Sequence, residues 1–350
     1  MKIGSVDLPS PFAIAPMAGM TDTAFRRLVK RHGGCGLVVT EMVSAEALAR
    51  GIGRTLEYAE YTEEERPISI QIFGGDPARM AAAAQIVEGM GADIVDVNMG
   101  CPVPKIAKHN AGCSLMREPA HAARVIAAMA KAVRIPVTVK MRAGWNDGER
   151  NAPTLAKMVE DAGAAAIAVH GRTAAQSYSG SADWDLVARI AGDLAIPVFG
   201  SGDCLEPEQI IERLASGVEG VLVGRGVLRN PWILAQASDL ARGLRPRSVT
   251  LEDRGRFLLD YVELLMNERV REPRLRSVAE VMELRRGRLE TAEGRSHDRW
   301  VINKIRALGS WYTKGLDGGS NLRTAINSAQ SLTELRELIG TFFLAPATVA

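Results

Sequence analysis

Residues 68–99 read ISIQIFGGDPARMAAAAQIVEGMGADIVDVNM, and this stretch decides the fold. It begins and ends with short apolar runs, and the alanine-rich segment between them starts at Asp76-Pro77. An Asp followed by a Pro is typical of a helix start. Continuous apolar runs of this length are typical of strands buried on both faces of a parallel sheet. The stretch therefore predicts a strand, a helix and a second, parallel strand.

The same alternation recurs along the N-terminal two thirds of the chain. Helical stretches separate eight apolar runs, at residues 12–17, 37–42, 68–73, 94–99, 137–142, 166–171, 197–202 and 220–225. Eight strand–helix units within about 250 residues are typical of a TIM barrel. A doubly wound open sheet is the alternative, but no GxGxxG pattern follows the first strand. We predict an α/β fold with a TIM (β/α)8 barrel over residues 1–244.

After the segment RGLRPRS (242–248) the strand pattern stops, and residues 250–342 have helical periodicity. Helices are predicted at residues 251–270, 274–290, 299–315, 321–330 and 332–343. From Arg245 onward there are 18 basic and 14 acidic residues, a net charge of +4, against −2 for the rest of the chain. A polyanionic partner would explain this excess, but an ordinary solvated helical surface explains it better on charge alone. We predict a helical-bundle domain over residues 245–345.

Composition indicates a globular protein with a substantial core, because 47% of the 350 residues are hydrophobic and the net charge is only +2. Four cysteines are too few for a disulfide scaffold. The sequence shows neither a signal-peptide pattern nor an apolar run long enough to span a membrane. We expect a cytoplasmic protein with reduced thiols, without membrane attachment and without an evident obligate protein partner.

Polar residues follow the predicted strands, at the end where TIM barrels carry their active sites. The strand-end residues are Pro16, Met17, Ala18, Glu41, Gln71, Asn98, Lys140, Arg142, His170, Ser201, Gly202, Asp203, Gly224 and Arg225. Glycine backbones after the last two strands favour a bound phosphate, to which Arg225 can add a charged contact. Lys140 either snorkels outward or points into the pocket, and Arg142 two residues on favours the pocket. Gln71 suits the amide edge of a heterocycle, whereas His170 is either structural or part of the pocket.

Cys101 lies in the turn NMGCP that follows the fourth strand. It could serve as a metal ligand, a nucleophile, a proton donor or an inert thiol. Cys101, His109 and Cys113 lack the paired short spacings of zinc sites, so no metal site is predicted. No neighbouring base is evident for a nucleophile, whereas an ordinary thiol is mostly protonated at pH 7 and can donate a proton. We interpret Cys35, Cys113 and Cys204 as small structural residues.

Seven motifs together resemble those of the tRNA-dihydrouridine synthases, in the bacterial group close to the nitrogen-regulation-locus homologues. They are, in chain order, APMAGMTDTAFR, QIFG, DVNMGCP, VKMRAGW, VHGRT, GSGD and VGRG. The segment SWYTKG and the downstream Arg323 resemble the helical domain of that family. The resemblance implies an FMN-containing barrel and a helical tRNA-binding domain. It also implies reduction of the C5–C6 double bond of a tRNA uridine with NADPH or NADH.

The resemblance also implies residue roles. FMN would contact Pro16, Met17, Ala18, Gln71, Lys140, His170, Ser201, Gly202, Asp203, Gly224 and Arg225. Asn98 and Arg142 would face the substrate, and Cys101 matches the general acid that protonates C5 after hydride delivery to C6. The nicotinamide cosubstrate would leave after reducing the flavin, because there is no dedicated Rossmann domain. The uridine would leave its stack to react.

The chain departs from the family pattern at two places. Ser201 stands where members often have Asn, which removes one side-chain amide. The residues Arg306, Ala307, Leu308 and Gly309 stand where Arg-Lys-His often precedes Ser-Trp-Tyr, which weakens any assignment of RNA contacts there. Arg285, Arg286 and Arg288 are candidates for contacts to tRNA phosphates, but an exposed helix face explains them nearly as well.

Three alternatives stay open on the sequence. A flavoenzyme acting on free pyrimidines would share the barrel but would not need the helical domain. An RNA-binding protein without activity would not need Cys101, Lys140 or the glycine turns. A phosphate-sugar isomerase or aldolase would use Lys140 as a Schiff base but would leave Cys101 without a role.

Overall fold

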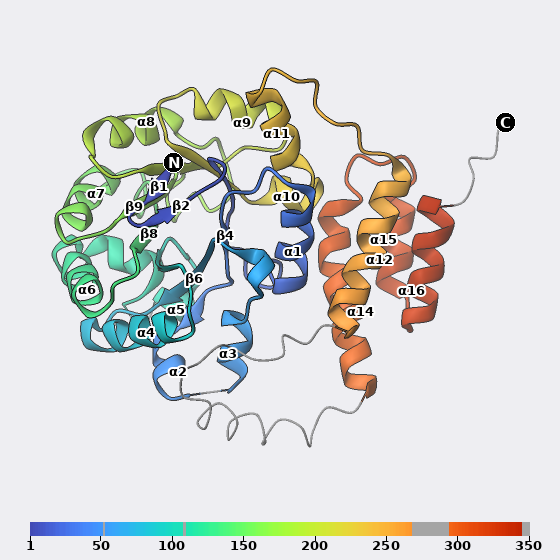
Figure 1. Cartoon of the computed structure of the whole chain (residues 1–350), viewed down its shortest axis with the longest axis horizontal. Helices are drawn as coiled ribbons and strands as arrows, with labels where there is room; N and C mark the ends of the chain where they lie inside the picture. Colours follow the sequence, from blue (N-terminus) through green and yellow to red (C-terminus); the bar gives the residue numbers. More distant parts are fainter. Residues whose placement is uncertain (52, 108–109, 268–293, 345–350) are drawn as a thin grey trace.

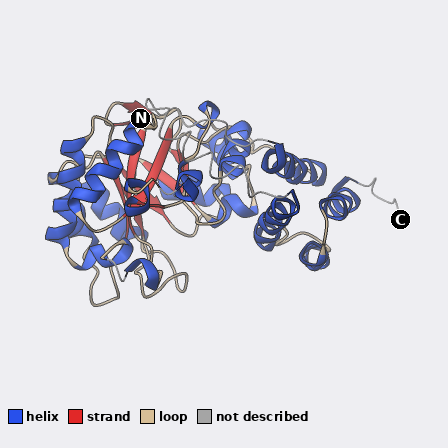
Figure 2. Cartoon of the chain, turned by 90° about the horizontal axis from the view of Figure 1, so that it is seen from below, coloured by secondary structure: helices blue, strands red, loops and turns tan. Residues whose placement is uncertain are grey.

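The computed structural model describes residues 1–51, 53–107, 110–267 and 294–344. These residues form a barrel of strands surrounded by helices, with a group of further helices packed against one side (Figures 1 and 2). The predicted helix at 274–290 lies outside the described residues. No helix within the described ranges has the length and apolar character needed to cross a bilayer.

Eight parallel strands form a nearly closed barrel, which confirms the predicted fold class. They are β3 (Phe12–Ile14), β4 (Val38–Val39), β6 (Ile68–Phe73), β7 (Ile94–Met99), β8 (Val137–Arg142), β9 (Ala166–His170), β10 (Val198–Ser201) and β11 (Gly220–Val223). Strands that follow one another along the chain are neighbours in the sheet, and β11 pairs with β3. A single parallel bridge between Ala13 and Leu37 joins β3 to β4 and completes the ring. The predicted strand at 37–42 is shorter than expected: β4 covers only Val38–Val39, and a second short strand, β5 (Val43–Ser44), also pairs with β6.

Helices follow the strands and cover the outside of the barrel. They are α1 (Thr23–His32), α2 (Ala45–Ala49), α3 (Gly53–Ala59), α4 (Pro77–Gly89), α5 (Pro104–Ala107), α6 (Pro119–Ala132), α7 (Ala152–Asp161), α8 (Trp184–Asp193), α9 (Pro207–Leu214), α10 (Arg225–Arg229) and α11 (Ile233–Ala241). The carboxylates of Asp22, Asp76 and Asp183 accept backbone N–H bonds at the starts of α1, α4 and α8. The local capping pattern therefore fixes where these helices begin.

A two-stranded hairpin closes the amino end of the barrel. It consists of β1 (Lys2–Ile3) and β2 (Val6–Asp7), which pair antiparallel. Ile3 packs in a buried cluster with the inward-facing Leu37, Phe199 and Leu222. This apolar cluster fills the amino end of the barrel. The opposite end, where the strands terminate, is therefore the open mouth of the barrel.

The helical domain consists of α12 (Leu251–Asn267), α14 (Gly294–Tyr312), α15 (Gly319–Ser328), α16 (Leu332–Ile339) and a π-helical turn at Gly340–Leu344. Helix α12 packs against α1, and α14 packs against α10 (Figure 1). The Phe25 ring meets the rings of Phe257 and Tyr261 edge-on, each at 6.1 Å between centroids. Helix α11 ends at Ala241 and α12 begins at Leu251, and we propose residue 244 as the domain boundary within this segment.

Candidate active site

Parallel strands bring their carboxyl ends to one rim of the barrel, and the predicted site residues follow those ends. The strand register pairs Asn98 with Lys140 on β7 and β8, and Arg142 with His170 on β8 and β9. Pro16, which follows β3, lines the same interior cavity as Lys140. Residues from four separate strands are therefore close together at the mouth.

A chain of amide hydrogen bonds fixes the turn that carries Cys101. The Asn98 Oδ1 atom accepts from the backbone N–H groups of Gly100 at 3.1 Å and Cys101 at 2.9 Å. The Asn98 Nδ2 atom donates to Gln71 Oε1 at 2.8 Å. Arg142 Nε donates to the Gly100 carbonyl at 2.9 Å. Both amide side chains are buried, whereas Cys101 is half-buried.

Asp96 completes this chain of hydrogen bonds and was not among the predicted site residues. Its carboxylate accepts from Gln71 Nε2 at 2.7 Å and from Thr138 Oγ1 at 2.6 Å. Burial raises the pKa of Asp96, while these two hydrogen bonds and the nearby Lys140 oppose the increase. The Gln71 amide is thus held with Nε2 toward Asp96 and Oε1 toward Asn98. Its position on β7, two residues before Asn98 and on the same strand face, was the available signal.

Lys140 supplies a cation to the barrel interior. Burial lowers its pKa to about 8, and repulsion from Arg142 adds to this effect. Attraction to Asp96 and Cys101 opposes the shift. Among the described residues its Nζ atom donates no hydrogen bond and forms no salt bridge within 4.0 Å. The ammonium group is therefore available to an anionic or electron-rich ligand.

Arg142 is buried and holds two loops together. Besides Gly100, its guanidinium donates from Nη1 to the carbonyls of Thr173 and Ser177, each at 3.0 Å. These carbonyls belong to the loop that follows β9. The side chain thus connects the Cys101 turn to the neighbouring loop. This structural role is additional to the substrate contact expected from the sequence.

His170 lies at the end of β9, and no acidic side chain in the described part of the chain forms an ion pair with it. Its pKa lies well below the ordinary value, because of burial first and then of the cations Lys140, Arg142, Arg172 and Arg225. The imidazole is therefore neutral at pH 7. Its Nδ1 atom accepts the backbone N–H of Arg172 at 3.3 Å, which leaves Nε2 as the N–H donor.

The turn after β10 depends on Gly202 and Asp203. Gly202 has φ 127°, and a Cβ atom there would come within 2.5 Å of Ala182 Cβ, so only glycine fits. The Asp203 carboxylate accepts from Arg172 Nη2 at 2.7 and 2.9 Å and from the Ala182 N–H at 2.7 Å. Asp203 therefore anchors the loop after β9, and Arg172 is a second residue of the site that was not predicted from the sequence. Ser201 is buried at the end of β10.

The turn after β11 places Gly224 and Arg225 beside the first loop. The atom nearest to a Cβ built on Gly224 is Met17 Sδ, at 3.6 Å. The Arg225 guanidinium lies 3.7 Å from Asp203 Oδ1 and 4.9 Å from the centroid of the exposed Tyr178 ring. Ala18, beside Met17, is exposed. These contacts bring the glycine turn and the Pro16–Ala18 segment to the same side of the mouth.

No metal site is evident within the described ranges, where no three His, Cys, Asp or Glu residues cluster suitably. His109 lies outside these ranges. Cys113 is buried, and its N–H donates to the Cys101 carbonyl at 3.1 Å. Cys35 and Cys204 are also buried.

The candidate RNA-contacting residues divide into two groups. Arg285, Arg286 and Arg288 lie outside the described residues. Arg306 donates to the carbonyls of Ile326 at 3.4 Å and Ala329 at 2.7 Å, so it caps the end of α15. Leu308 is buried and Ala307 is exposed. Within the described ranges, Arg323 makes two long hydrogen bonds, to Thr313 and Ser320, each at 3.5 Å.

The family model described as dihydrouridine synthase (Dus) matches residues 13–345. The chain belongs to the dihydrouridine synthase family. A "probable tRNA-dihydrouridine synthase" of Rickettsia conorii is 36% identical over 345 residues, which cover 98% of this chain and 96% of the relative. The "tRNA-dihydrouridine synthase B" of Pseudomonas aeruginosa is 42% identical over 245 residues, covering 69% and 73%. Dihydrouridine synthases are flavin oxidoreductases, so the chain is an enzyme of this class.

Solved structures share the fold at low sequence identity. Histamine dehydrogenase from Rhizobium sp. 4-9 superposes with a TM-score of 0.53 at 14% identity, covering 74% of this chain and 50% of that one. A 2-naphthoyl-CoA reductase superposes with a TM-score of 0.51 at 13% identity, covering 70% and 52%. These similarities support the barrel fold of the family member described here.

The mouth of this dihydrouridine synthase suits a phosphate-bearing flavin. Four cations, Lys140, Arg142, Arg172 and Arg225, lower the pKa of His170, and among the described residues only Lys140 of these four forms neither a hydrogen bond nor an ion pair. The Gln71 amide has a second N–H beyond the one donated to Asp96. An unpartnered cation, an amide edge and two glycine turns match the ring and phosphate parts of such a cofactor.

Proposed function

We propose that the chain reduces a specific uridine of tRNA to 5,6-dihydrouridine, with FMN as its cofactor and NADPH or NADH as the reductant. The observation that carries the proposal is the position of Cys101. Its turn, fixed by Asn98 and Arg142, lies beside the unpartnered ammonium group of Lys140 at the barrel mouth. The names of the related proteins support tRNA as the substrate. We also propose that the enzyme is cytoplasmic, because tRNA is found in the cytoplasm.

The residues around the mouth of the barrel would have separate roles in the reaction. A reduced flavin, when bound, would supply the hydride for C6 of the uracil. We propose that the Cys101 thiol donates the proton to C5 from the opposite face. Lys140 would stabilise the negative charge of the reduced ring through a preorganised contact. The neutral His170 would donate from Nε2 to an acceptor on the ring system.

The first loop and the two glycine turns would supply the remaining contacts to FMN. We propose that Pro16, Met17 and Ala18 lie along the ring and that Gln71 meets its pyrimidine edge. The backbone of the two turns would hold the ribityl chain and the phosphate; these residues are Ser201, Gly202, Asp203, Gly224 and Arg225. Because the Asp203 carboxylate is already bound by Arg172, its side chain would act by shaping the turn.

Asn98 and Arg142 would serve the substrate while they hold the Cys101 turn. Besides its bond to Gln71, the Asn98 amide donates to Met42 Sδ at 3.7 Å, and we propose that a uracil carbonyl replaces this weak sulfur acceptor. We also propose that the helical domain binds the tRNA backbone. Its affinity should then fall with salt, by roughly 0.7 to 0.9 log units per phosphate contact for each log unit of salt.

The test is nucleoside mass spectrometry on unmodified tRNA incubated with the flavin-loaded protein and NADPH. One uridine should gain two hydrogens, and mapping the modified site gives its position. Free uracil and uridine serve as competing substrates. Reduction of these but not of tRNA would favour a free-pyrimidine enzyme. A protein that binds no flavin would contradict the proposal.

A further inference from the structure

Glu41 belongs to the ring of strand-end residues, but none of the roles above uses it. Its Oε2 atom accepts the backbone N–H of Gly19 at 2.5 Å. The carbonyl of the same Gly19 accepts from Lys304 Nζ at 3.0 Å. Glu41 follows β4 of the barrel, whereas Lys304 lies on α14 of the helical domain. One glycine of the barrel is thus held through both of its backbone polar groups, and one of the two partners comes from the other domain.

The side chains that hold Gly19 form a buried charge cluster. Lys304 Nζ lies 3.0 Å from Asp22 Oδ2 and 3.6 Å from Glu41 Oε1. The side chains of Lys304, Asp22 and Glu41 are only 13%, 14% and 6% exposed. Burial lowers the pKa of Lys304, but the two carboxylates outweigh this effect and raise it above the ordinary value. Lys304 is therefore charged at neutral pH, and its removal would leave two buried carboxylates without their cation.

Gly19 lies in the loop between β3 and α1, which carries the residues assigned to the flavin. Met17 N–H donates to Thr21 Oγ1 at 3.0 Å, and the Met17 carbonyl accepts from the N–H groups of Met20 and Thr21 at 3.0 and 3.1 Å. This tight turn makes Gly19 and Met17 move together. A displacement of Gly19 would therefore be transmitted to Met17, which faces Gly224.

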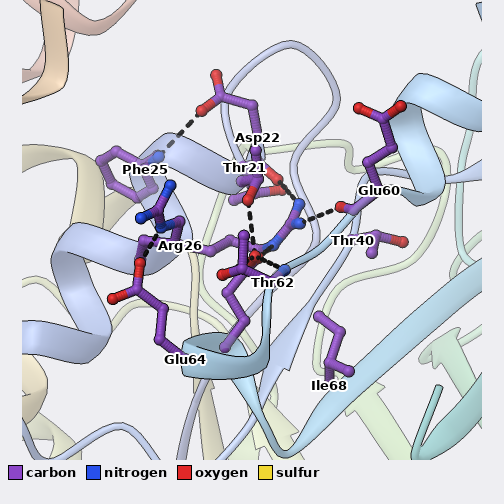
Figure 3. A network of polar contacts seen from close by, with 12 residues as sticks. Thr21, Asp22, Phe25, Arg26, Thr40, Glu60, Thr62, Glu64 and Ile68 are labelled. Atoms are coloured by element: carbon purple, nitrogen blue, oxygen red, sulfur yellow. Dashed lines mark hydrogen bonds and ion pairs between the residues drawn. The ribbon is translucent and has the colours of Figure 1, made fainter. Parts of the chain in front are cut away.

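The far end of the same loop is anchored within the barrel. Arg26 is buried and donates to the carbonyls of Thr21 at 2.6 Å and Glu60 at 2.8 Å (Figure 3). Tyr261 of the helical domain donates its hydroxyl to Asp22 Oδ2 at 2.7 Å. The start of α1 is thus held by several partners. Gly19, at the tip of the loop, is held differently. Within the described residues, its hydrogen bonds are those with Glu41 and Lys304.

We propose that Lys304 is a positioning residue of the active site, through which the helical domain holds the Met17–Ala18 segment in the shape that receives the flavin. The inference rests on the proposed cofactor site. It assigns to the helical domain a role at the cofactor in addition to binding tRNA. The barrel site would accordingly be incomplete without the helical domain.

The test compares Lys304→Met with Lys314→Met in the full-length protein, with FMN binding followed by fluorescence quenching in the absence of tRNA. Lys314 is exposed on the same domain, and its ammonium group lies over the Trp311 ring. We expect Lys304→Met to weaken FMN binding and lower kcat by about 10-fold to 100-fold each, since small displacements of reacting groups have effects of this size. The visible spectrum of the bound flavin should shift, the KM for tRNA should change less than kcat, and Lys314→Met should bind FMN as the wild type does.

Two more variants keep the test decisive if Lys304→Met folds poorly. Glu41→Gln removes the charge from the barrel side and should reproduce the weaker FMN binding. Lys304→Arg retains the charge and should restore most of it. Equal FMN affinity and spectra in Lys304→Met, Glu41→Gln and the wild type would overturn the inference. A wild-type protein that binds no FMN would instead overturn the proposed function.

Discussion

The backbone N–H of Cys101 donates to the Oδ1 atom of Asn98 at 2.9 Å, and the Asn98 amide is held in turn by Gln71. The acid proposed for C5 is therefore placed by a side chain of the preceding strand, and not by its turn alone. Asn98→Ala should lower kcat about 10-fold to 100-fold, because the turn loses its acceptor. Asn98→Asp keeps that acceptor but lacks the donor to Gln71, so it should recover only part of the kcat lost by Asn98→Ala. Steady-state kinetics with tRNA check this, and equal kcat values for the two variants would contradict a positioning role.

Cys101→Ala should lower kcat about 100-fold to 10,000-fold, the range expected when a general acid is lost. Reduction of the bound flavin by NADPH, measured alone by stopped-flow absorbance, should stay unchanged because that step does not need the thiol. Cys35→Ala is the matched control, since this thiol is buried away from the mouth. Wild-type turnover by Cys101→Ala would exclude the assignment.

The lowered pKa of Lys140 predicts a pH dependence of FMN binding. Its folded pKa of about 8 lies below the ordinary 10.5, so the apoprotein loses the ammonium charge as pH rises through 8. FMN affinity should therefore fall above pH 8, by up to about 10-fold per pH unit. Lys140→Met should bind FMN more weakly and without this slope. Fluorescence titrations between pH 7 and pH 9.5 measure both, and parallel slopes would count against Lys140.

The ion pair of Arg26 and Glu65 is buried, with side chains 1% and 0% exposed and 2.7 Å between Nε and Oε1. Glu65→Gln leaves the Arg26 charge without its counter-ion, and should lower the free energy of unfolding by about 3 kcal/mol or more. Glu252→Gln alters an exposed partner of Arg256 and should cost less than about 1 kcal/mol. Urea unfolding of both variants measures the difference, and equal losses would contradict the burial argument.

His32 predicts how the domain junction responds to acid. It stacks on Trp232 at 4.4 Å between ring centroids. Burial, followed by repulsion from Arg247, lowers its pKa from 6.5 to about 4. A lowered folded pKa contributes stability that is present above pH 6.5 and is lost as pH falls through 4. His32→Phe keeps an aromatic ring but cannot titrate, so its unfolding free energy should fall less than that of the wild type over this window. Identical pH profiles in urea unfolding would contradict the prediction.

The sequence predicted the elements well because strands and helix starts are local features. The apolar runs at 68–73, 94–99 and 137–142 match the observed strands residue for residue. The run at 37–42 did not, since it contains Thr40 and Glu41, and β4 ends at Val39. The resemblance to the dihydrouridine synthases was likewise carried by short local motifs, and the family match confirms it.

The sequence by itself determined the barrel, the helical domain and the rim on which Cys101, Lys140 and His170 lie, because strand order and strand direction follow from the repeated alternation. Only the tertiary structure decided what holds these residues. Asp96 orients Gln71 from a neighbouring strand, and Arg172 binds the Asp203 carboxylate. Lys304 contacts Gly19, which lies 285 residues earlier in the chain. Such contacts join side chains that share no periodicity or spacing. They arise only once the packed core has brought distant segments within hydrogen-bonding distance.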